Sequence, residues 1–231
     1  HPSILRNAMS FYVELPRDDA LDRATRAVIF DGGIPQHARA ELERWVNVVE
    51  PPELGPAHAG LEEHGLGVTT AFLFGSLEEH TPPTVPFCEV DHVRVLDTNT
   101  GSPESPYYFD ILERITTHLD KFPDDYSLVN ISLGPELAVD DDEVTLWTAA
   151  LDKRFAHGWC IATVAAGNAG ERDAESGLNR IQPPADGVNV LSVGAADTQG
   201  TEWVRASYSC VGPGRSPGIV KPDGLAFGGS E

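Results

Sequence analysis

Short apolar runs alternate along this chain with stretches whose apolar residues recur at helical spacing. The runs predict buried strands at 27–30, 90–96, 127–133, 159–165 and 190–193. The helical stretches are 37–46, a segment that starts near His64, 108–119 and 141–155. This order of strands and helices predicts an α/β fold, with a mostly parallel sheet covered by helices on both faces.

Polar residues follow the first strand and open the second helical stretch. Asp31 comes directly after the apolar run Ala27–Phe30, and Gly32 and Gly33 let the chain turn there. His64 is followed by Gly65, so at a helix start its imidazole would be open on one side. No second His or Cys stands at a zinc-ligand spacing from His64, and no metal site is predicted. Taken alone, an Asp-Gly turn and an exposed helix-start histidine are the favoured explanations of these two motifs.

Two later strands also end in candidate site residues. The small residues Ala165, Ala166 and Gly167 lead to Asn168, whose side-chain amide could donate a hydrogen bond to a developing oxyanion. The stretch Ser132-Leu133-Gly134 ends another strand. An ordinary Asn-containing loop and an ordinary strand end are the alternatives. In parallel sheets, sites form where strands end at their carboxyl edge, and this favours a common site.

Composition narrows the possible functions. The formal net charge of −20 excludes a nucleic-acid binder, which needs a basic face. No apolar stretch is long enough to predict a membrane span. The 231 residues include three cysteines, Cys88, Cys160 and Cys210, in no CxxC pair or disulfide framework. Free thiols lean towards a cytoplasmic location, but the sequence leaves the compartment open.

Together and in this order, the motifs resemble the subtilisin-like serine proteases, the subtilase or peptidase S8 family. The matching stretches are Asp31 after its strand, His64-Gly-x-x-Val68, Ser132–Gly134, Ala165–Asn168, 190–195 and Lys221-Pro222-Asp223. The resemblance runs from about Arg26 to the last residue, so 1–25 is expected to be an N-terminal extension and 26–231 the peptidase domain. It implies the three-layer subtilisin-like fold, and no cofactor.

The resemblance also implies a role for each motif. His64 would be the general base, and Asp31 would fix its tautomer and stabilise its imidazolium. Asn168 would donate to the oxyanion. The backbone of Ser132, Leu133 and Gly134 would bind an extended peptide or protein substrate by strand addition. Ala165, Ala166 and Gly167 would line the pocket for the substrate side chain before the cut.

The nucleophilic serine is the part of the family pattern that this sequence does not supply. The family's Gly-Thr-Ser motif is absent. Ser216 is followed by Pro217, which lacks the backbone N–H that a nucleophile elbow needs, and Ser230 has no helix after it. We therefore expect the C-terminal part of the fold to be missing here, with the serine beyond this chain.

A serine beyond this chain has consequences for its partners and its activity. A missing C-terminal segment or another chain would be the partner, and this chain alone would be inactive towards peptides. The alternative function is a peptide-binding pseudo-protease or interaction module, although binding needs none of Asp31, His64 and Asn168. A nucleotide-binding α/β fold is a third interpretation, but both the G-x-G-x-x-G motif and the P-loop are absent.

Overall fold

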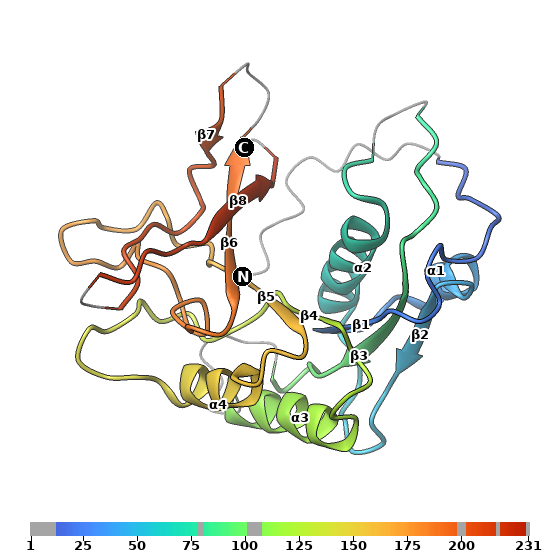
Figure 1. Ribbon diagram of the computed structural model, residues 1–231, viewed down its shortest axis with the longest axis horizontal. Coiled ribbons are helices and arrows are strands. Elements are labelled where there is room, and N and C mark those ends of the chain that lie inside the picture. The colour runs from blue at the N-terminus through green and yellow to red at the C-terminus, as the bar shows by residue number, and fades with distance from the viewer. Residues whose placement is uncertain (1–12, 78–80, 101–107, 198–201, 216–217, 230–231) are drawn as a thin grey trace. The chain divides into compact units, whose positions relative to one another are not determined.

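The computed structural model describes residues 13–77, 81–100, 108–197, 202–215 and 218–229 (Figure 1). It divides into two compact units, His1–Val129 and Asn130–Glu231. Ser216, Ser230 and the first part of the expected N-terminal extension lie outside the described residues. The predicted α/β class, with a mainly parallel sheet and helices, is confirmed.

The described part of the first unit places three parallel strands beside three helices. Its elements are β1 (Arg26–Asp31), α1 (Gln36–Leu42), β2 (Val46–Val49), α2 (Ala59–Phe74), β3 (Glu89–Arg94) and α3 (Tyr108–Lys121). β3 pairs in parallel with both β1 and β2, and α1 lies beside β2 (Figure 1). Ile29, Ile34, Trp45 and Phe74 belong to one buried apolar cluster. This packing fixes the carboxyl end of β1, where Asp31 lies.

Two helix boundaries in this unit differ from the sequence prediction. The helix expected at 37–46 ends at Leu42, because Trp45 and Val46 are buried in a turn and in β2, which pairs with β3. Helix α2 begins at Ala59, where the ring of His58 accepts a hydrogen bond from the N–H of Gly60 at 3.2 Å. His64 therefore lies inside the helix and not at its start.

In its described residues, the second unit contains three strands paired in parallel and one helix. Its elements are α4 (Leu146–Phe155), β5 (Ile161–Ala165), β6 (Leu191–Asp197), β7 (Val204–Arg205) and β8 (Gly224–Phe227), while β4 (Leu128–Ile131) crosses the boundary between the units. β6 pairs in parallel with β5 and β8 and antiparallel with β7 (Figure 1). β5 leads directly into the stretch that contains Asn168.

Helix α4 starts later than the predicted helical stretch 141–155. The acidic residues 140–143 precede the helix, and Thr145 caps it by accepting a hydrogen bond from the N–H of Thr148 at 3.2 Å. A threonine that satisfies a free N–H sets the helix start more strongly than acids near the dipole do. The helix predicted at 141–155 therefore begins five residues later, at Leu146.

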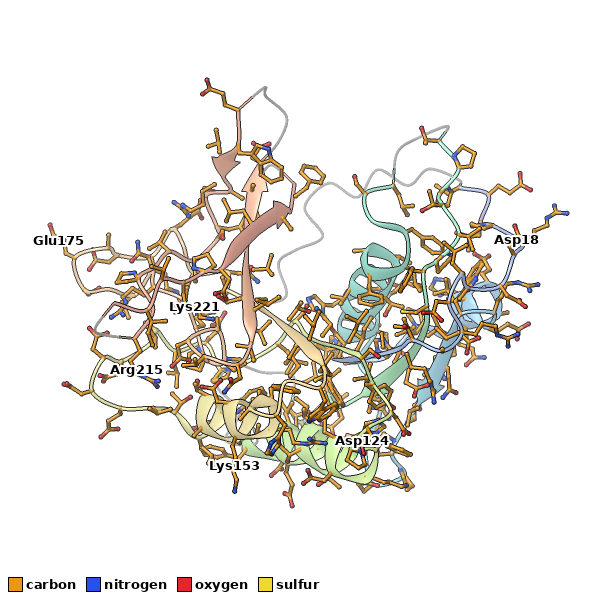
Figure 2. The ribbon with its side chains drawn as sticks, in the orientation of Figure 1. Asp18, Asp124, Lys153, Glu175, Arg215 and Lys221 are labelled. Carbon is orange, nitrogen blue, oxygen red and sulfur yellow. The ribbon has the colours of Figure 1, made fainter. Side chains whose placement is uncertain are left out.

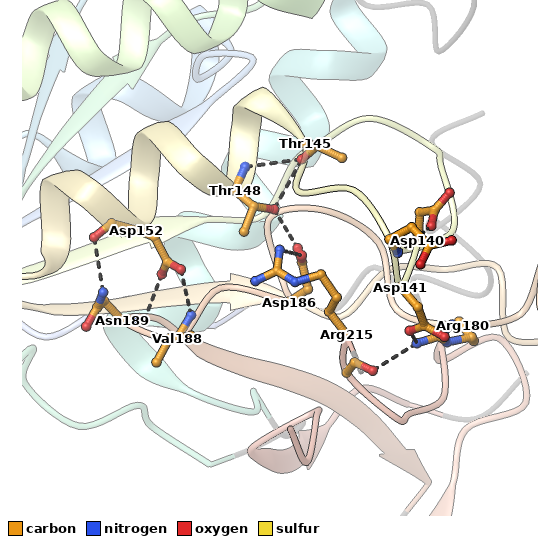
Figure 3. Close-up of polar contacts among 12 residues, drawn as sticks. Asp140, Asp141, Thr145, Thr148, Asp152, Arg180, Asp186, Val188, Asn189 and Arg215 are labelled. Atoms are coloured by element: carbon orange, nitrogen blue, oxygen red, sulfur yellow. Dashed lines mark hydrogen bonds and ion pairs between the residues drawn. The ribbon is translucent and has the colours of Figure 1, made fainter. Parts of the chain in front are cut away.

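A loop that follows residue 182 is held against α4 (Figure 3). The carboxylate of Asp152 accepts from the N–H groups of Val188 and Asn189 at 2.9 and 2.8 Å. Asp186, which is fully buried, accepts from the hydroxyl of Thr148 and pairs with Arg215 at 3.3 Å. These bonds fix the loop that packs against the candidate pocket residues described below.

Charged side chains lie mostly at the surface, and Asp18, Asp124, Lys153 and Glu175 are exposed examples (Figure 2). Lys221 is an exception, because it is buried and donates to the carbonyl of Val190 at 2.9 Å and to Asp223 at 2.7 Å. Across the described parts of the chain, no helix combines the length and the apolar character needed to cross a membrane.

Candidate active site

Asp31 and His64 form a hydrogen-bonded pair in the first unit. Asp31 is the last residue of β1 and is fully buried, whereas His64 is partly exposed on α2. Oδ1 of Asp31 lies 2.8 Å from Nδ1 of His64 and accepts from the N–H of Gly32 at 2.7 Å. The other carboxylate oxygen, Oδ2, is buried without a hydrogen-bond partner among the described residues. The structure therefore brings together the two residues that the sequence placed 33 positions apart.

The carboxylate of Asp31 places a negative charge beside the ring of His64 and so affects the pKa of His64. Burial lowers the pKa of His64, but the hydrogen bond and the negative charge of Asp31 outweigh burial and raise the pKa above its usual value. Because Nδ1 of His64 is engaged with Asp31, Nε2 is the ring nitrogen that can exchange a proton with a reactant. The arrangement can thus act as a general base whose imidazolium is stabilised.

Close packing sets the distance between the two residues. A Cβ atom on Gly65 would lie 2.2 Å from the carbonyl oxygen of Gly33, so only glycine lets α2 approach the turn after β1 this closely. Gly65 directly follows His64, and Gly33 lies two residues after Asp31. The glycine next to the histidine therefore has a packing role that the sequence interpretation did not give it.

A second histidine, His92 of β3, contacts the segments that carry this pair and was not among the residues predicted from the sequence. Its Nε2 accepts from the N–H of Gly33 at 3.1 Å, and its Nδ1 lies 2.8 Å from the hydroxyl of Thr69. Burial lowers the pKa of His92 to about 4, so the ring is neutral near pH 7. The signal that could have drawn attention to it is a histidine that stands between Asp91 and Arg94 in a stretch predicted to be a buried strand.

The buried His92 predicts a loss of stability in acid. The unfolded chain takes up a proton at a pKa near 6.5, whereas the folded chain resists protonation of His92 down to a pKa of about 4. As the pH falls through this window the unfolded state binds more protons, and the folded state loses roughly 3 kcal/mol from this group. We expect urea midpoints to fall more steeply between pH 6.5 and 4 in the wild type than in His92→Phe. Parallel pH profiles of the two proteins would contradict this expectation.

The corner that carries Asn168 belongs to the second unit and follows β5. Gly167 has φ = 108°, a conformation that favours glycine, and Asn168 is exposed. Cys210 holds both sides of the corner: its N–H donates to the carbonyl of Gly167 at 3.0 Å, and its Sγ accepts from the N–H of Ala169 at 3.2 Å. From the sequence, Cys210 was expected only to be a free thiol, and no local signal indicated this contact.

The other predicted binding residues lie near one another in this unit. Ser132, Leu133 and Gly134 follow β4, which ends at Ile131, so the strand predicted to reach residue 133 is shorter. A Cβ atom on Gly134 would lie 2.3 Å from the carbonyl oxygen of Pro183.

The residue before Pro183, Gln182, contacts the other predicted stretch. The N–H of Gln182 donates to the carbonyl of Ala166 at 3.0 Å, and its side chain packs against Gly167, while Ala165 is exposed. Residues 182–183 thus contact both predicted substrate-binding stretches. Within the described residues, no group of three or more His, Cys, Asp or Glu side chains could hold a metal ion.

An α/β fold with a buried Asp–His pair at the end of a parallel strand defines a class of candidate hydrolases. The description of the subtilase family, Peptidase S8, matches residues 18–230. The chain therefore belongs to the subtilase family. No curated protein sequence matches the chain significantly.

Solved structures of similar fold include proteases and a macrocyclase. The prenylagaramide maturation protease PagA shares 21% identity with this chain over 89% of it and 64% of PagA, with a TM-score of 0.59. The self-cleaved protease domain of PatA shares 22% identity over 89% of this chain and 68% of that domain, with a TM-score of 0.58. The PatG macrocyclase in complex with peptide shares 18% identity over 90% and 66%, with a TM-score of 0.57. The chain thus spans less than two thirds of the PagA structure.

Proposed function

We propose that this chain is the main part of a serine endopeptidase domain, in which His64 is the general base and Asp31 its stabilising carboxylate. The observation that supports the proposal most directly is the 2.8 Å contact between Nδ1 of His64 and Oδ1 of the buried Asp31. In this role His64 takes the proton of the attacking serine through Nε2 and later gives it to the leaving amine. The peptide bound to the PatG macrocyclase, a protein of similar fold, is consistent with a peptide substrate.

The second unit supplies the proposed binding groups. The exposed amide of Asn168 donates to the oxyanion of the tetrahedral intermediate. The backbone of Ser132–Gly134 pairs with an extended substrate, and Ala165–Gly167 borders the pocket for the side chain before the cut. The fixed corner around Gly167 supports this assignment, because an oxyanion donor must be held in place before the charge develops.

We assign the nucleophile to a serine outside the described residues. Two serine hydroxyls of the second unit are engaged within that unit. The hydroxyl of Ser132 donates to Asn130 at 2.9 Å. That of Ser209 accepts from the N–H of Ala195 at 2.9 Å and donates to the carbonyl of Cys210 at 3.5 Å. Ile161 and Leu191 are exposed on β5 and β6. A serine-bearing segment that covers these apolar side chains would be stabilised by about 25 cal/mol per Å² of apolar area.

The proposal is tested by peptide hydrolysis. The native protein, incubated with a mixture of unrelated peptides, should cleave internal bonds, and mass spectrometry should detect the products. A fluorophosphonate probe should label one serine, and peptide mapping should locate it. Peptide binding without cleavage and without labelling would instead establish the pseudo-protease function.

Asn168→Ala should lower kcat for peptide hydrolysis by about 100- to 1000-fold with little change in KM, a range known from the equivalent change in subtilisin. The reason is that the amide bonds the oxyanion in the transition state and contributes little to substrate binding. Asn189→Ala, at another exposed asparagine of the same unit, is the matched control and should stay within about twofold of the wild type. Equal kinetics of the two variants would remove Asn168 from the mechanism.

A further inference from the structure

His92 connects the two segments that carry Asp31 and His64. Gly33, whose N–H donates to Nε2 of His92 at 3.1 Å, lies two residues after Asp31 in the turn that follows β1. Thr69, whose hydroxyl lies 2.8 Å from Nδ1 of His92, lies five residues after His64 in α2. One buried ring therefore bonds both to the turn that holds the carboxylate and to the helix that holds the base.

The protonation state of this ring follows from its contacts. Nε2 accepts a hydrogen bond from a backbone N–H, so the proton of the neutral ring is on Nδ1 and is donated to the hydroxyl of Thr69. Both ring nitrogens are satisfied in a fully buried position. A rotation or a change of tautomer would leave buried polar groups without partners, so the ring holds one orientation.

Charged side chains surround His92, so its own charge state affects the Asp31–His64 pair. Asp31 and Glu50 act on it as negative charges, and Arg39 and His64 as positive ones. Arg39 and Glu50 are paired with each other. A proton on His92 would place a second buried positive charge near His64 and oppose formation of the imidazolium that the reaction needs.

We propose that His92 is a positioning residue, which holds Gly33 and Thr69 so that Asp31 and His64 stay in hydrogen-bond contact. The proposal rests on the proposed function for its consequence in catalysis, but the contact itself can be measured without catalysis. A core histidine with no positioning role would affect overall stability and leave the Asp31–His64 bond unchanged.

The test uses NMR of the histidine rings in this chain. His92→Phe fills the space but removes both bonds, and Thr69→Val removes only the bond to α2 while keeping the side-chain shape. In both variants we expect the Nδ1 proton of His64 to exchange with solvent about five to ten times faster, as for the loss of one ordinary hydrogen bond. The pKa of His64 should also move down from its raised value.

Three further variants separate positioning from stability. Thr69→Ser keeps the hydroxyl, and His92→Gln keeps an acceptor for the N–H of Gly33, so both should restore slow exchange of the His64 proton at least in part. Ile115→Val weakens the buried core of the same unit without touching His92 and should leave that proton unchanged. If His92→Phe does not fold, Thr69→Val decides the matter. Wild-type exchange and pKa of His64 in a folded Thr69→Val protein would overturn the proposal.

Kinetics of the native protein then connect the contact to the reaction. We expect Thr69→Val to lower kcat about tenfold with an unchanged KM, because a slightly misplaced base slows the chemical step and not substrate binding. Absence of peptidase activity in the wild type would refute the proposed function, whereas the NMR result would still decide whether His92 positions the pair. An altered His64 bond with unchanged kcat would refute the positioning role in catalysis.

Discussion

Replacing His64 with alanine in the native protein should lower kcat for peptide hydrolysis by about 10⁶-fold, the size known for loss of the triad histidine in subtilisin itself. The neighbouring buried histidine, His92, cannot replace it, because both of its ring nitrogens are engaged with Gly33 and Thr69. Without a base the serine hydroxyl keeps its proton and attacks poorly. Initial rates on a cleaved peptide, measured under saturating substrate, give kcat directly.

His58→Ala is the matched control for this experiment. His58 caps the same helix and is exposed, and its ring accepts from the N–H of Gly60. Its loss should cost about 1 kcal/mol of stability and leave kcat within about twofold. Activity of His64→Ala within tenfold of the wild type would show that another group takes the proton, and the assignment of His64 would fail.

The sequence was informative where a signal is local. Short runs of β-branched and small apolar residues identified β1, β5 and β6, and the valine-rich stretch 90–96 identified β3. β7 has only two residues and produces no such run, whereas β8 is a short apolar run, Gly-Leu-Ala-Phe, that was not predicted as a strand. The Asp31 motif pointed to the end of β1 because a turn with two glycines follows an apolar run directly.

The sequence was uninformative where a contact joins distant positions. The roles of His92 and Cys210 depend on partners far away in the chain, 59 residues for Gly33 and 41 for Ala169. Periodicity describes which face a residue occupies, but it does not say which group of another element that face will meet. The position of His64 within α2 was missed for a related reason, since a histidine cap at His58 is a weak start signal beside Ser, Thr, Asp or Asn.

His64 and His92 show how surroundings shift the pKa of one residue type in opposite directions. Burial lowers the pKa of both, but only His64 bonds a carboxylate, and that bond reverses the shift. Because the pKa of His64 is higher in the folded than in the unfolded chain, protonation of His64 stabilises the fold at a pH below the unfolded pKa. This stabilisation is lost as the pH rises through the folded pKa. The folded pKa of His92 is lowered, so His92 destabilises the fold as the pH falls below the unfolded pKa. The pair therefore combines a proton acceptor with a neighbour that stays neutral at the same pH.

Asp31→Asn should lower kcat about 10⁴-fold, as loss of the triad carboxylate does in other serine proteases. Here a single oxygen, Oδ1, accepts from both the N–H of Gly32 and Nδ1 of His64. An asparagine that keeps its oxygen in this position retains both bonds but loses the charge. Its NH₂ group then occupies the place of Oδ2, which is buried without a partner among the described residues.

The two effects of this substitution can be separated by the state of the His64 ring. If the amide keeps its oxygen on His64, the Nδ1 proton persists, and burial, no longer opposed by the carboxylate charge, draws the pKa of His64 downward. If the amide turns its NH₂ group to His64 instead, Nδ1 must accept, the proton moves to Nε2, and the base is blocked. Nitrogen-15 shifts of the ring distinguish these tautomers. Near-normal kcat with either tautomer would contradict the role of Asp31, because the proposed mechanism needs both the charge and a free Nε2.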